Sequence, residues 1–401
     1  MTSRERVLNA LNFKPVDRLP RDLGGMRSTC LSCFAYPKLV QALGLPPRRP
    51  RVYDLAQMLA LPDVDVLDAL GCDVVMAEPD VTNAFAQPEF WKDYDFGGRL
   101  PALVRDPAQF RLEPDGTLVA GSMRMPPASH TFNTEHADQI LVLDDDLPKP
   151  DLKQLREHVK NGAWKDADII RLREHCRRVR ESTDRAVFLW GPFNLGISIH
   201  GFGGVAVFPM LCLLEPDFVR ELHEIILEGA LRNVKMLLPE VRKYVDIVGI
   251  DADDWGNQNA LMAPPAVYRD LFLPFRKRHC EAIRAVAPEI KTFLHSCGAI
   301  YDILDMLVES GIDIINPIQW QAGGRTVQEW KDKCRGRIAM WGGGVNSQAT
   351  LPFGSVRDVE DEARRNVRIL SKDSGYIFCN IHNILAEIAP EKVIAMYRTA
   401  M

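Results

Sequence analysis

One short stretch of the chain, Ile290-Lys291-Thr292-Phe293-Leu294-His295-Ser296-Cys297-Gly298, joins an apolar run to a pair of metal-binding side chains. Side chains alternate between the two faces of a strand, so His295 and Cys297 point to the same side. Imidazole and thiolate are ligands that zinc prefers, and two of them make half of a tetrahedral site. Because α/β proteins carry their chemistry at the C-terminal ends of parallel strands, we expect half a zinc site at the end of this strand.

Further short apolar runs occur on both sides of this stretch and alternate with helical patterns. The expected strands are Cys72–Met76, Ala186–Trp190, Ile247–Ile250, Ile290–Leu294, Ile312–Ile315, Ile338–Trp341 and Tyr376–Phe378. The expected helices include Val64–Leu70, Pro216–Leu237, Pro264–Ala287, Ile300–Ser310 and Val356–Ser371. Strands that are apolar on both faces and alternate with helices indicate a parallel sheet. Seven or eight such units within about 330 residues favour an α/β fold of the (β/α)₈ TIM-barrel type. No Gly-x-Gly-x-x-Gly follows a first strand, which argues against a dinucleotide-binding fold.

The first 150 residues are less regular and rich in Pro and Asp. They begin with a helical pattern over Ser3–Leu11. Residues 80–150 contain many turn signals and short β-like runs, at Thr117–Ala120 and Gln139–Leu143. We therefore expect residues 1–401 to form one barrel domain with an irregular N-terminal region that carries extra short β elements, including an excursion at about 80–150.

The composition excludes several classes of protein. The 401 residues are 46% hydrophobic and 26% charged, which is typical of a globular protein. The net charge of −5 argues against a nucleic-acid partner, which requires a basic surface. No secretory signal and no run of about 18 apolar residues appears, so we expect no membrane association. The nine cysteines are scattered, which favours reduced thiols and a cytoplasmic location.

Polar residues follow the expected strands and should meet at one rim of the barrel. Asp251, Asp253 and Asp254 come after Ile247–Ile250, where they either cap the loop or act as a zinc ligand or general base. His382 follows the last strand and is a geometrically reasonable third metal ligand, with Cys379 as the competing one.

Two other groups of Cys and His residues are interpreted as incidental. Cys30 and Cys33 form a Cys-x-x-Cys without a partner pair, and we interpret them as two unrelated thiols, with half a zinc knuckle or a redox pair as the alternative. His175 and Cys176 lie in a charged helical segment, and we interpret them as a surface residue and a core residue.

The order and spacing of several segments resemble one family. They are Arg4-Glu5-Arg6-Val7-Leu8-Asn9-Ala10-Leu11, Pro15-Val16-Asp17-Arg18-Leu19-Pro20, Asp253-Asp254-Trp255-Gly256-Asn257-Gln258, His295-Ser296-Cys297-Gly298, His382-Asn383-Ile384-Leu385 and Ala389-Pro390-Glu391-Lys392-Val393. Over nearly its whole length the chain is similar to the uroporphyrinogen decarboxylase-like superfamily of (β/α)₈ barrels.

The branch of this superfamily decides the expected activity. Its decarboxylases carry an Arg-Gln-Ala-Gly-Arg segment after the first strand, whose arginines bind the porphyrinogen carboxylates. Here the corresponding stretch is Leu23-Gly24-Gly25-Met26-Arg27, so that basic clamp is missing apart from Arg27. The chain looks more like the other branch, the zinc methyltransferases that exchange methyl groups with corrinoid proteins, including coenzyme M methyltransferases and demethylases.

This resemblance implies a zinc-dependent methyltransferase that acts on a small O-, N- or S-methylated substrate and a corrinoid (cobalamin) protein as partner, and it is compatible with a homodimer. His295 and Cys297 match the family's metal motif, and His382 fills a third position that is Cys in the family. A zinc with fewer thiolates is a harder Lewis acid, better suited to an ether oxygen or an amine. Asp253 or Asp254 would complete the coordination or protonate the leaving group. The expected substrate-binding residues are Trp255, Asn257, Trp341 and Asn194.

Two alternatives to this function stay open. The first is a metal-free decarboxylase or lyase similar to uroporphyrinogen decarboxylase. The second is a non-catalytic protein that binds a corrinoid or another tetrapyrrole.

Overall fold

A parallel β-sheet forms the centre of the protein, in a computed structural model that describes residues 1–77, 90–134 and 147–400. Its seven strands are β4 (Val74–Met76), β10 (Ala186–Leu189), β11 (Ile247–Ala252), β12 (Lys291–His295), β13 (Ile314–Asn316), β14 (Ala339–Trp341) and β15 (Tyr376–Ile377). They pair in chain order from β4 to β15, each parallel to its neighbour. Each strand begins or ends within two residues of the run expected from the sequence.

The two edge strands of this sheet are joined by the backbone of residues 20–22. Arg21 forms a parallel bridge with Phe378, directly after β15. On its other side the Arg21 carbonyl oxygen accepts the N–H of Asp73, directly before β4, at 2.7 Å. The sheet therefore curls into a TIM-barrel-like arrangement, in agreement with the fold class expected from the sequence.

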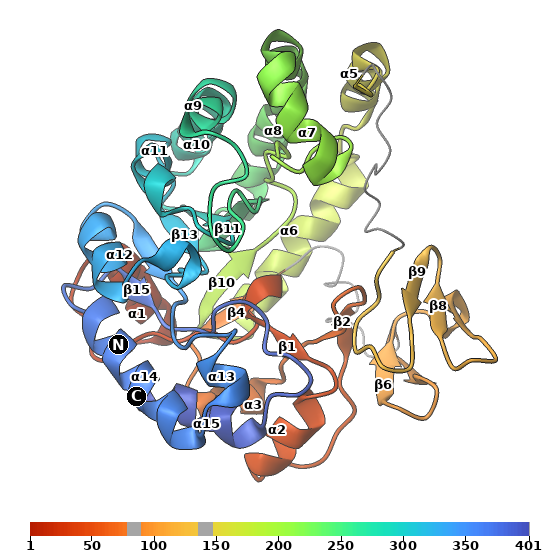
Figure 1. The fold of residues 1–401 in the computed structure, drawn as a ribbon, viewed down its shortest axis with the longest axis vertical. Helices are drawn as coiled ribbons and strands as arrows, with labels where there is room; N and C mark the ends of the chain where they lie inside the picture. Colours follow the sequence, from red (N-terminus) through yellow and green to blue (C-terminus); the bar gives the residue numbers. More distant parts are fainter. Residues whose placement is uncertain (78–89, 135–146, 401) are drawn as a thin grey trace.

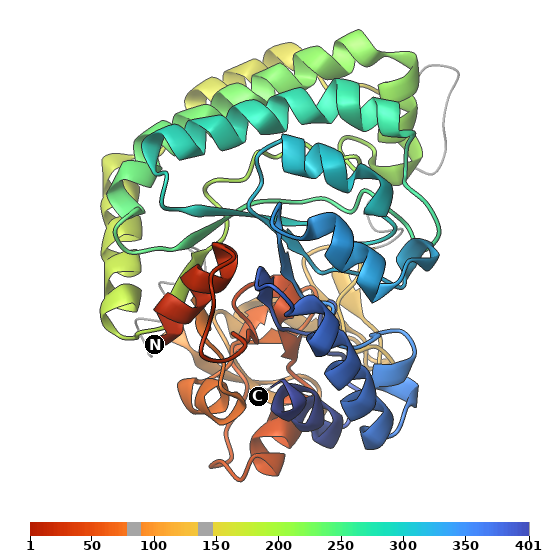
Figure 2. The ribbon, with the colours of Figure 1, turned by 90° about the vertical axis from the view of Figure 1, so that its left-hand side faces the viewer.

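Helices surround the sheet on its outer side (Figure 1). Apart from α1 (Ser3–Leu11), which is described below, the α-helices of the described residues are α2 (Tyr36–Ala42), α3 (Val64–Leu70), α5 (Leu152–Asn161), α6 (Asp166–Glu181), α7 (Gly204–Leu214), α8 (Pro216–Val241), α9 (Pro265–Val267), α10 (Leu273–Val286), α11 (Leu304–Glu309), α12 (Val327–Cys334), α13 (Thr350–Phe353), α14 (Val356–Leu370) and α15 (Pro390–Thr399). The long helices α8 and α10 lie side by side across one end of the molecule (Figure 2). Among the described residues, no helix is long and apolar enough to cross a membrane.

The interior of the barrel is filled by alternate residues of the strands. Phe188, Phe293, Ile314 and Trp341 belong to one buried cluster. Helix α1 (Ser3–Leu11) adds apolar side chains to the same cluster and contacts β4, β10 and β15. Because side chains alternate along a strand, the inward direction of Phe293 gives His295 the same inward direction, at the end of β12.

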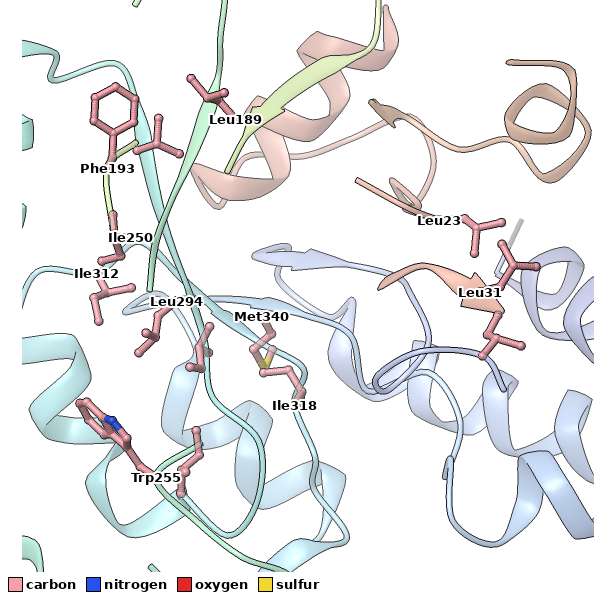
Figure 3. Close-up of a cluster of buried hydrophobic side chains, with 14 of the residues drawn as sticks. Leu23, Leu31, Leu189, Phe193, Ile250, Trp255, Leu294, Ile312, Ile318 and Met340 are labelled. Carbon is pink, nitrogen blue, oxygen red and sulfur yellow. The ribbon is translucent and has the colours of Figure 1, made fainter. Parts of the chain in front are cut away.

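The intervening strand residues face the surrounding helices. Leu189, Ile250, Leu294 and Met340 belong to a second, larger buried cluster, which also includes Leu23, Leu31, Phe193, Trp255, Ile312 and Ile318 (Figure 3). Both faces of the sheet are therefore buried from solvent, which is why its strands are apolar runs without alternating polar residues.

Buried ion pairs hold the N-terminal segment against the starts of the strands. Asp73, fully buried before β4, accepts Nη1 of Arg6 at 2.7 Å and both Nη atoms of Arg18 at 2.7 and 2.8 Å. Arg6 also donates to Asp17 at 2.7 and 2.8 Å. The charged residues of the N-terminal segments therefore serve the closure of the barrel, at the end opposite to His295.

The helix expected at Pro264–Ala287 is interrupted by a π-helix. The chain forms α9, then a π-helical turn over Tyr268–Phe272, then α10. Pro274 lies in the first turn of α10; it has no N–H to donate, and its ring excludes a regular α turn before it. The widened turn places Tyr268 and Phe272 against Trp255, with the Tyr268 ring stacked at 4.9 Å.

The described part of the N-terminal region contains small antiparallel sheets. Strands β1 (Leu31–Ser32), β3 (Leu59–Ala60) and β2 (Val52–Asp54) form one sheet, and β5 (Lys92–Asp95) and β6 (Pro101–Val104) form another. A third contains β7 (Phe110–Leu112), β8 (Leu118–Ala120) and β9 (Met123–Met125). Strand β8 lies within the β-like run at Thr117–Ala120, whereas Gln139–Leu143 lies outside the described residues.

Candidate metal centre

Three side chains with metal-binding atoms meet at the C-terminal end of the sheet. His295 ends β12, Cys297 follows it, and His382 lies in the loop after β15. One ligand atom from each lies within 4.8 Å of the others, and Cys297 Sγ is 3.3 Å from His295 Nε2. Two ligands of a tetrahedral zinc with N and S donors are about 3.5 Å apart. The three side chains therefore fit a zinc ion with one position left for another ligand.

The imidazole of His295 is held in one orientation by Asn316. Asn316 Nδ2 donates to the carbonyl oxygen of Trp341 at 2.9 Å, so its Oδ1 faces the other way. That Oδ1 lies 2.6 Å from His295 Nδ1, which must carry the proton because an amide oxygen can only accept. In the neutral ring Nε2 is then the unprotonated nitrogen, and its lone pair points towards Cys297. This arrangement is typical of metal-binding histidines, whose second nitrogen donates to a fixed acceptor.

Asp254 supplies a negative charge beside these ligands. Its Oδ1 accepts the N–H of Cys297 at 2.8 Å and lies 3.6 Å from His295 Nε2. Burial raises the pKa of Asp254, but the nearby His295, which is positive whenever its ring is protonated, and the hydrogen bond from Cys297 outweigh burial and lower this pKa. Burial and then the charge of Asp254 raise the pKa of the Cys297 thiol, so a metal must displace a proton to bind there.

His382 has a backbone conformation that is uncommon for a residue with a side chain. Its φ of 60° is left-handed, and Asn380 Nδ2 donates to its carbonyl oxygen. Such conformations persist where the surrounding structure imposes them, often at functional sites. Burial and the nearby His295 lower the pKa of His382 to about 4, so its ring is neutral at pH 7 and offers a lone pair.

The loop that carries Cys297 touches the neighbouring loop backbone to backbone. Gly298 has a φ of +85°, and a Cβ at this position would lie 1.9 Å from the carbonyl oxygen of Gly256. The carbonyl oxygen of Asn257 accepts the N–H of Ala299 at 2.9 Å, and Gly298 N–H donates to Gln319 Oε1 at 2.9 Å. The glycine after Cys297 is therefore required by this close approach.

A cavity of about 340 Å³ opens beside the three ligands. Asp254, Cys297 and His382 form part of its wall. The rest consists of four amide or hydroxyl side chains and three aliphatic ones: Gln319, Ser347, Gln348, Asn383, Leu351, Leu385 and Ile388. Its volume lies at the small end of the range for ligand sites, so it suits a small molecule with hydrogen-bonding groups.

The two aspartates expected to act in catalysis lie in different surroundings. Asp254 lines the cavity, as described above. Asp253 is 2% exposed and accepts the Ser198 hydroxyl at 2.6 Å, the N–H of Ile199 at 3.0 Å and Nε1 of Trp255. Burial raises the pKa of Asp253 to about 6, but the carboxylate is occupied in anchoring the loop after β10. Of the two, the structure puts Asp254 beside the candidate ligands.

The expected substrate-binding residues lie away from this cavity. Trp341 is buried in the barrel interior, and Trp255 is 2% exposed under Tyr268. Asn257 is exposed and caps its own turn by accepting two backbone N–H groups. Asn194 is half-buried in the loop after β10, with an Oδ1 that has no hydrogen-bond partner among the described residues. The cavity wall consists of amides, hydroxyls and aliphatic groups where the sequence suggested aromatic residues.

Cys379, the competing third ligand, belongs to the buried interior cluster. It is fully buried, and its thiol donates to the Asn380 carbonyl oxygen at 3.2 Å. Cys30 and Cys33 are also buried, as free thiols. His175 was expected at the surface, and this prediction was wrong: the residue is 2% exposed, because α6 turns this side towards β4 and α3.

Three residues that contact this site have no role in the site predicted from the sequence. They are Asn316, Gln319 and Ser28, whose hydroxyl lies 3.0 Å from His295 Nδ1. Asn316 ends a strand beside β12, and that position was its only signal. Ser28 comes from the segment that follows residues 20–22, and its approach depends on closure of the barrel.

Comparison with known proteins gives a family match and a fold match. Residues 151–401 match the sequence profile of the family described as Uroporphyrinogen decarboxylase (URO-D). The chain is 20% identical over 276 residues to uroporphyrinogen decarboxylase 2, chloroplastic, of Arabidopsis thaliana, and the match spans 66% of this chain and 66% of the relative.

Among solved structures, the chain resembles a methyltransferase from Methanosarcina mazei. The TM-score is 0.55 at 13% identity, and the alignment covers 100% of this chain and 98% of that one. At this identity the likeness supports the fold.

Proposed function

The chain belongs to the uroporphyrinogen decarboxylase family, and within it we propose a zinc-dependent methyltransferase that moves a methyl group between a small methylated substrate and a corrinoid protein. The observation that carries this proposal is the grouping of His295, Cys297 and His382 beside an open cavity. These are the residues for which the sequence resemblance implies zinc.

The orientation and protonation of the candidate ligands support metal binding independently of the sequence resemblance. Asn316 fixes His295 with Nε2 unprotonated, and burial keeps His382 neutral at pH 7. Asp254 stays ionised, which offsets the charge of a dication. Zinc bound here would act as a Lewis acid that draws charge from the heteroatom carrying the methyl group.

The chain's own residues also restrict the substrate. Gln319, Gln348, Ser347 and Asn383 offer hydrogen bonds to a polar substrate, while the aliphatic side of the cavity accepts an apolar part. Asp254, with its lowered pKa, is a carboxylate at pH 7, so it can accept a hydrogen bond from the substrate but holds no proton for the leaving group. A ligand set with two imidazoles and one thiolate favours an O-methyl or N-methyl donor over a thioether.

The decisive experiment combines metal analysis with an assay of methyl transfer to free cob(I)alamin from a panel of methyl ethers, methylamines and thioethers. We expect about one zinc per chain, and activity that disappears with a strong chelator and returns with zinc. Cys297→Ser and His382→Ala should each lose zinc and activity.

Cys379→Ser is the matched control, because it removes the competing thiol without touching the three ligands. It should keep its zinc. Retention of zinc and activity by Cys297→Ser would refute the assignment. A metal-free enzyme that decarboxylates an acid would favour the decarboxylase alternative instead.

A further inference from the structure

A second cavity lies on another side of the barrel, between α3, α6 and the outer face of β4. Its volume is about 380 Å³, and it shares no lining residue with the cavity at the metal centre. Leu61, Leu67, Val75 and Val179 form part of its apolar wall. The polar side chains that line it include His175 and Arg178 from α6, and no carboxylate lines it among the described residues. The cavity is thus an apolar chamber with a basic edge.

His175 is an unusual residue to find in such a wall. It is 2% exposed, and neither of its ring nitrogens has a hydrogen-bond partner within the described parts of the chain. Burial, with a smaller effect of Arg178, lowers the pKa of His175 to about 4, so the ring is neutral at pH 7 and has one N–H to donate. A buried polar group without a partner costs free energy, and a ligand in the cavity would remove that cost.

Among the described residues, the positive charge that lines this cavity is only partly neutralised. Arg51 is paired with Asp63, at 2.6 Å. Arg178, one helical turn after His175 and on the same face of α6, has no ion pair within the described residues. One free guanidinium and one neutral N–H donor match a group with a single negative charge and two acceptor oxygens.

We propose that this cavity binds a small monocarboxylic acid with an apolar body, whose carboxylate contacts Arg178 and the N–H of His175. The apolar part lies against α3 and β4. This site is separate from the metal centre, and its occupancy does not depend on the function proposed there.

Isothermal titration of the full chain with benzoate and 3-methylbutanoate tests the proposal, with benzamide and 3-methylbutanamide as their uncharged counterparts. We expect at least one of the two acids to bind, and the amide of that acid to bind at least tenfold more weakly. Arg178→Gln should weaken binding of the acid at least tenfold. Arg171→Gln is the matched control on the same helix, because Arg171 is exposed and paired with Asp168, and it should bind as the wild type does.

A second variant separates binding from stability. His175→Phe keeps a ring of similar shape and removes both unpartnered nitrogens, so the ligand-free protein should melt at a higher temperature while its affinity for the acid falls at least tenfold. Failure of both acids to bind, equal binding of an acid and its amide when that acid binds, or unchanged affinity in either Arg178→Gln or His175→Phe would overturn the proposal.

Discussion

Replacing Asn316 by alanine is expected to weaken zinc binding about tenfold while the protein stays folded. The variant removes the acceptor that lies 2.6 Å from His295 Nδ1, together with the bond that orients this acceptor on Trp341. Loss of such a partner typically lowers metal affinity by about 10–100-fold, or roughly 1.4–2.7 kcal/mol.

The structure favours the lower end of this range for the single variant. The hydroxyl of Ser28 remains 3.0 Å from His295 Nδ1 and can take over as acceptor. Only the double variant Ser28→Ala with Asn316→Ala leaves the ring without either partner, so we expect its affinity to fall towards about 100-fold. The two substitutions should therefore be coupled, with a double effect larger than the sum of the single ones.

The assay is competition for zinc with a chromophoric chelator at a fixed pH of about 7.5, because metal affinity depends on the protonation of the ligands. Asn366→Ala is the matched control: Asn366 is also fully buried and donates to the carbonyl oxygens of Gly343 and Gly344, but contacts none of the three candidate ligands. Unchanged affinity in Asn316→Ala, or an equal fall in Asn366→Ala, would refute the reasoning.

Three further predictions concern stability. Gly298→Ala should lower the free energy of unfolding by at least about 1–2 kcal/mol, the cost of a left-handed residue alone, because its Cβ also meets the Gly256 carbonyl oxygen; urea denaturation measures this. Asp73→Ala should lower it by about 3–5 kcal/mol, since two arginines lose their buried partner, and an effect below about 1 kcal/mol would contradict this. Burial and, to a smaller extent, the charge of Arg276 lower the pKa of His279 in the folded protein to about 3. In the unfolded chain the pKa is about 6.5, so between these two values only the unfolded chain binds the proton. The free energy of unfolding therefore decreases as the pH falls through this range. His279→Phe should therefore remove about 2 kcal/mol of the loss between pH 7.5 and 5, and parallel pH profiles of variant and wild type would count against it.

The sequence located the regular elements where local signals are strong. Helix α1 begins at Ser3, as expected, because Thr2 and Glu5 form a capping box, and the strands follow apolar runs that are buried on both faces. The π-helical turn before α10 was not foreseen, because the pattern of apolar residues does not reveal how the chain accommodates Pro274. The burial of His175 was not predicted for a related reason. A helix rich in charged residues is predicted to be exposed to solvent, because the sequence does not show which elements pack against it.

By itself the sequence determined that His295 and Cys297 share one side of a strand end, because that follows from the alternation of side chains along a strand. Only the tertiary structure decided that His382, and not Cys379, joins them, and that Asn316 orients the first ligand. These contacts join residues from β12, β13 and the loop after β15, so their distances depend on the curvature and closure of the sheet. No local pattern in the chain contains that information.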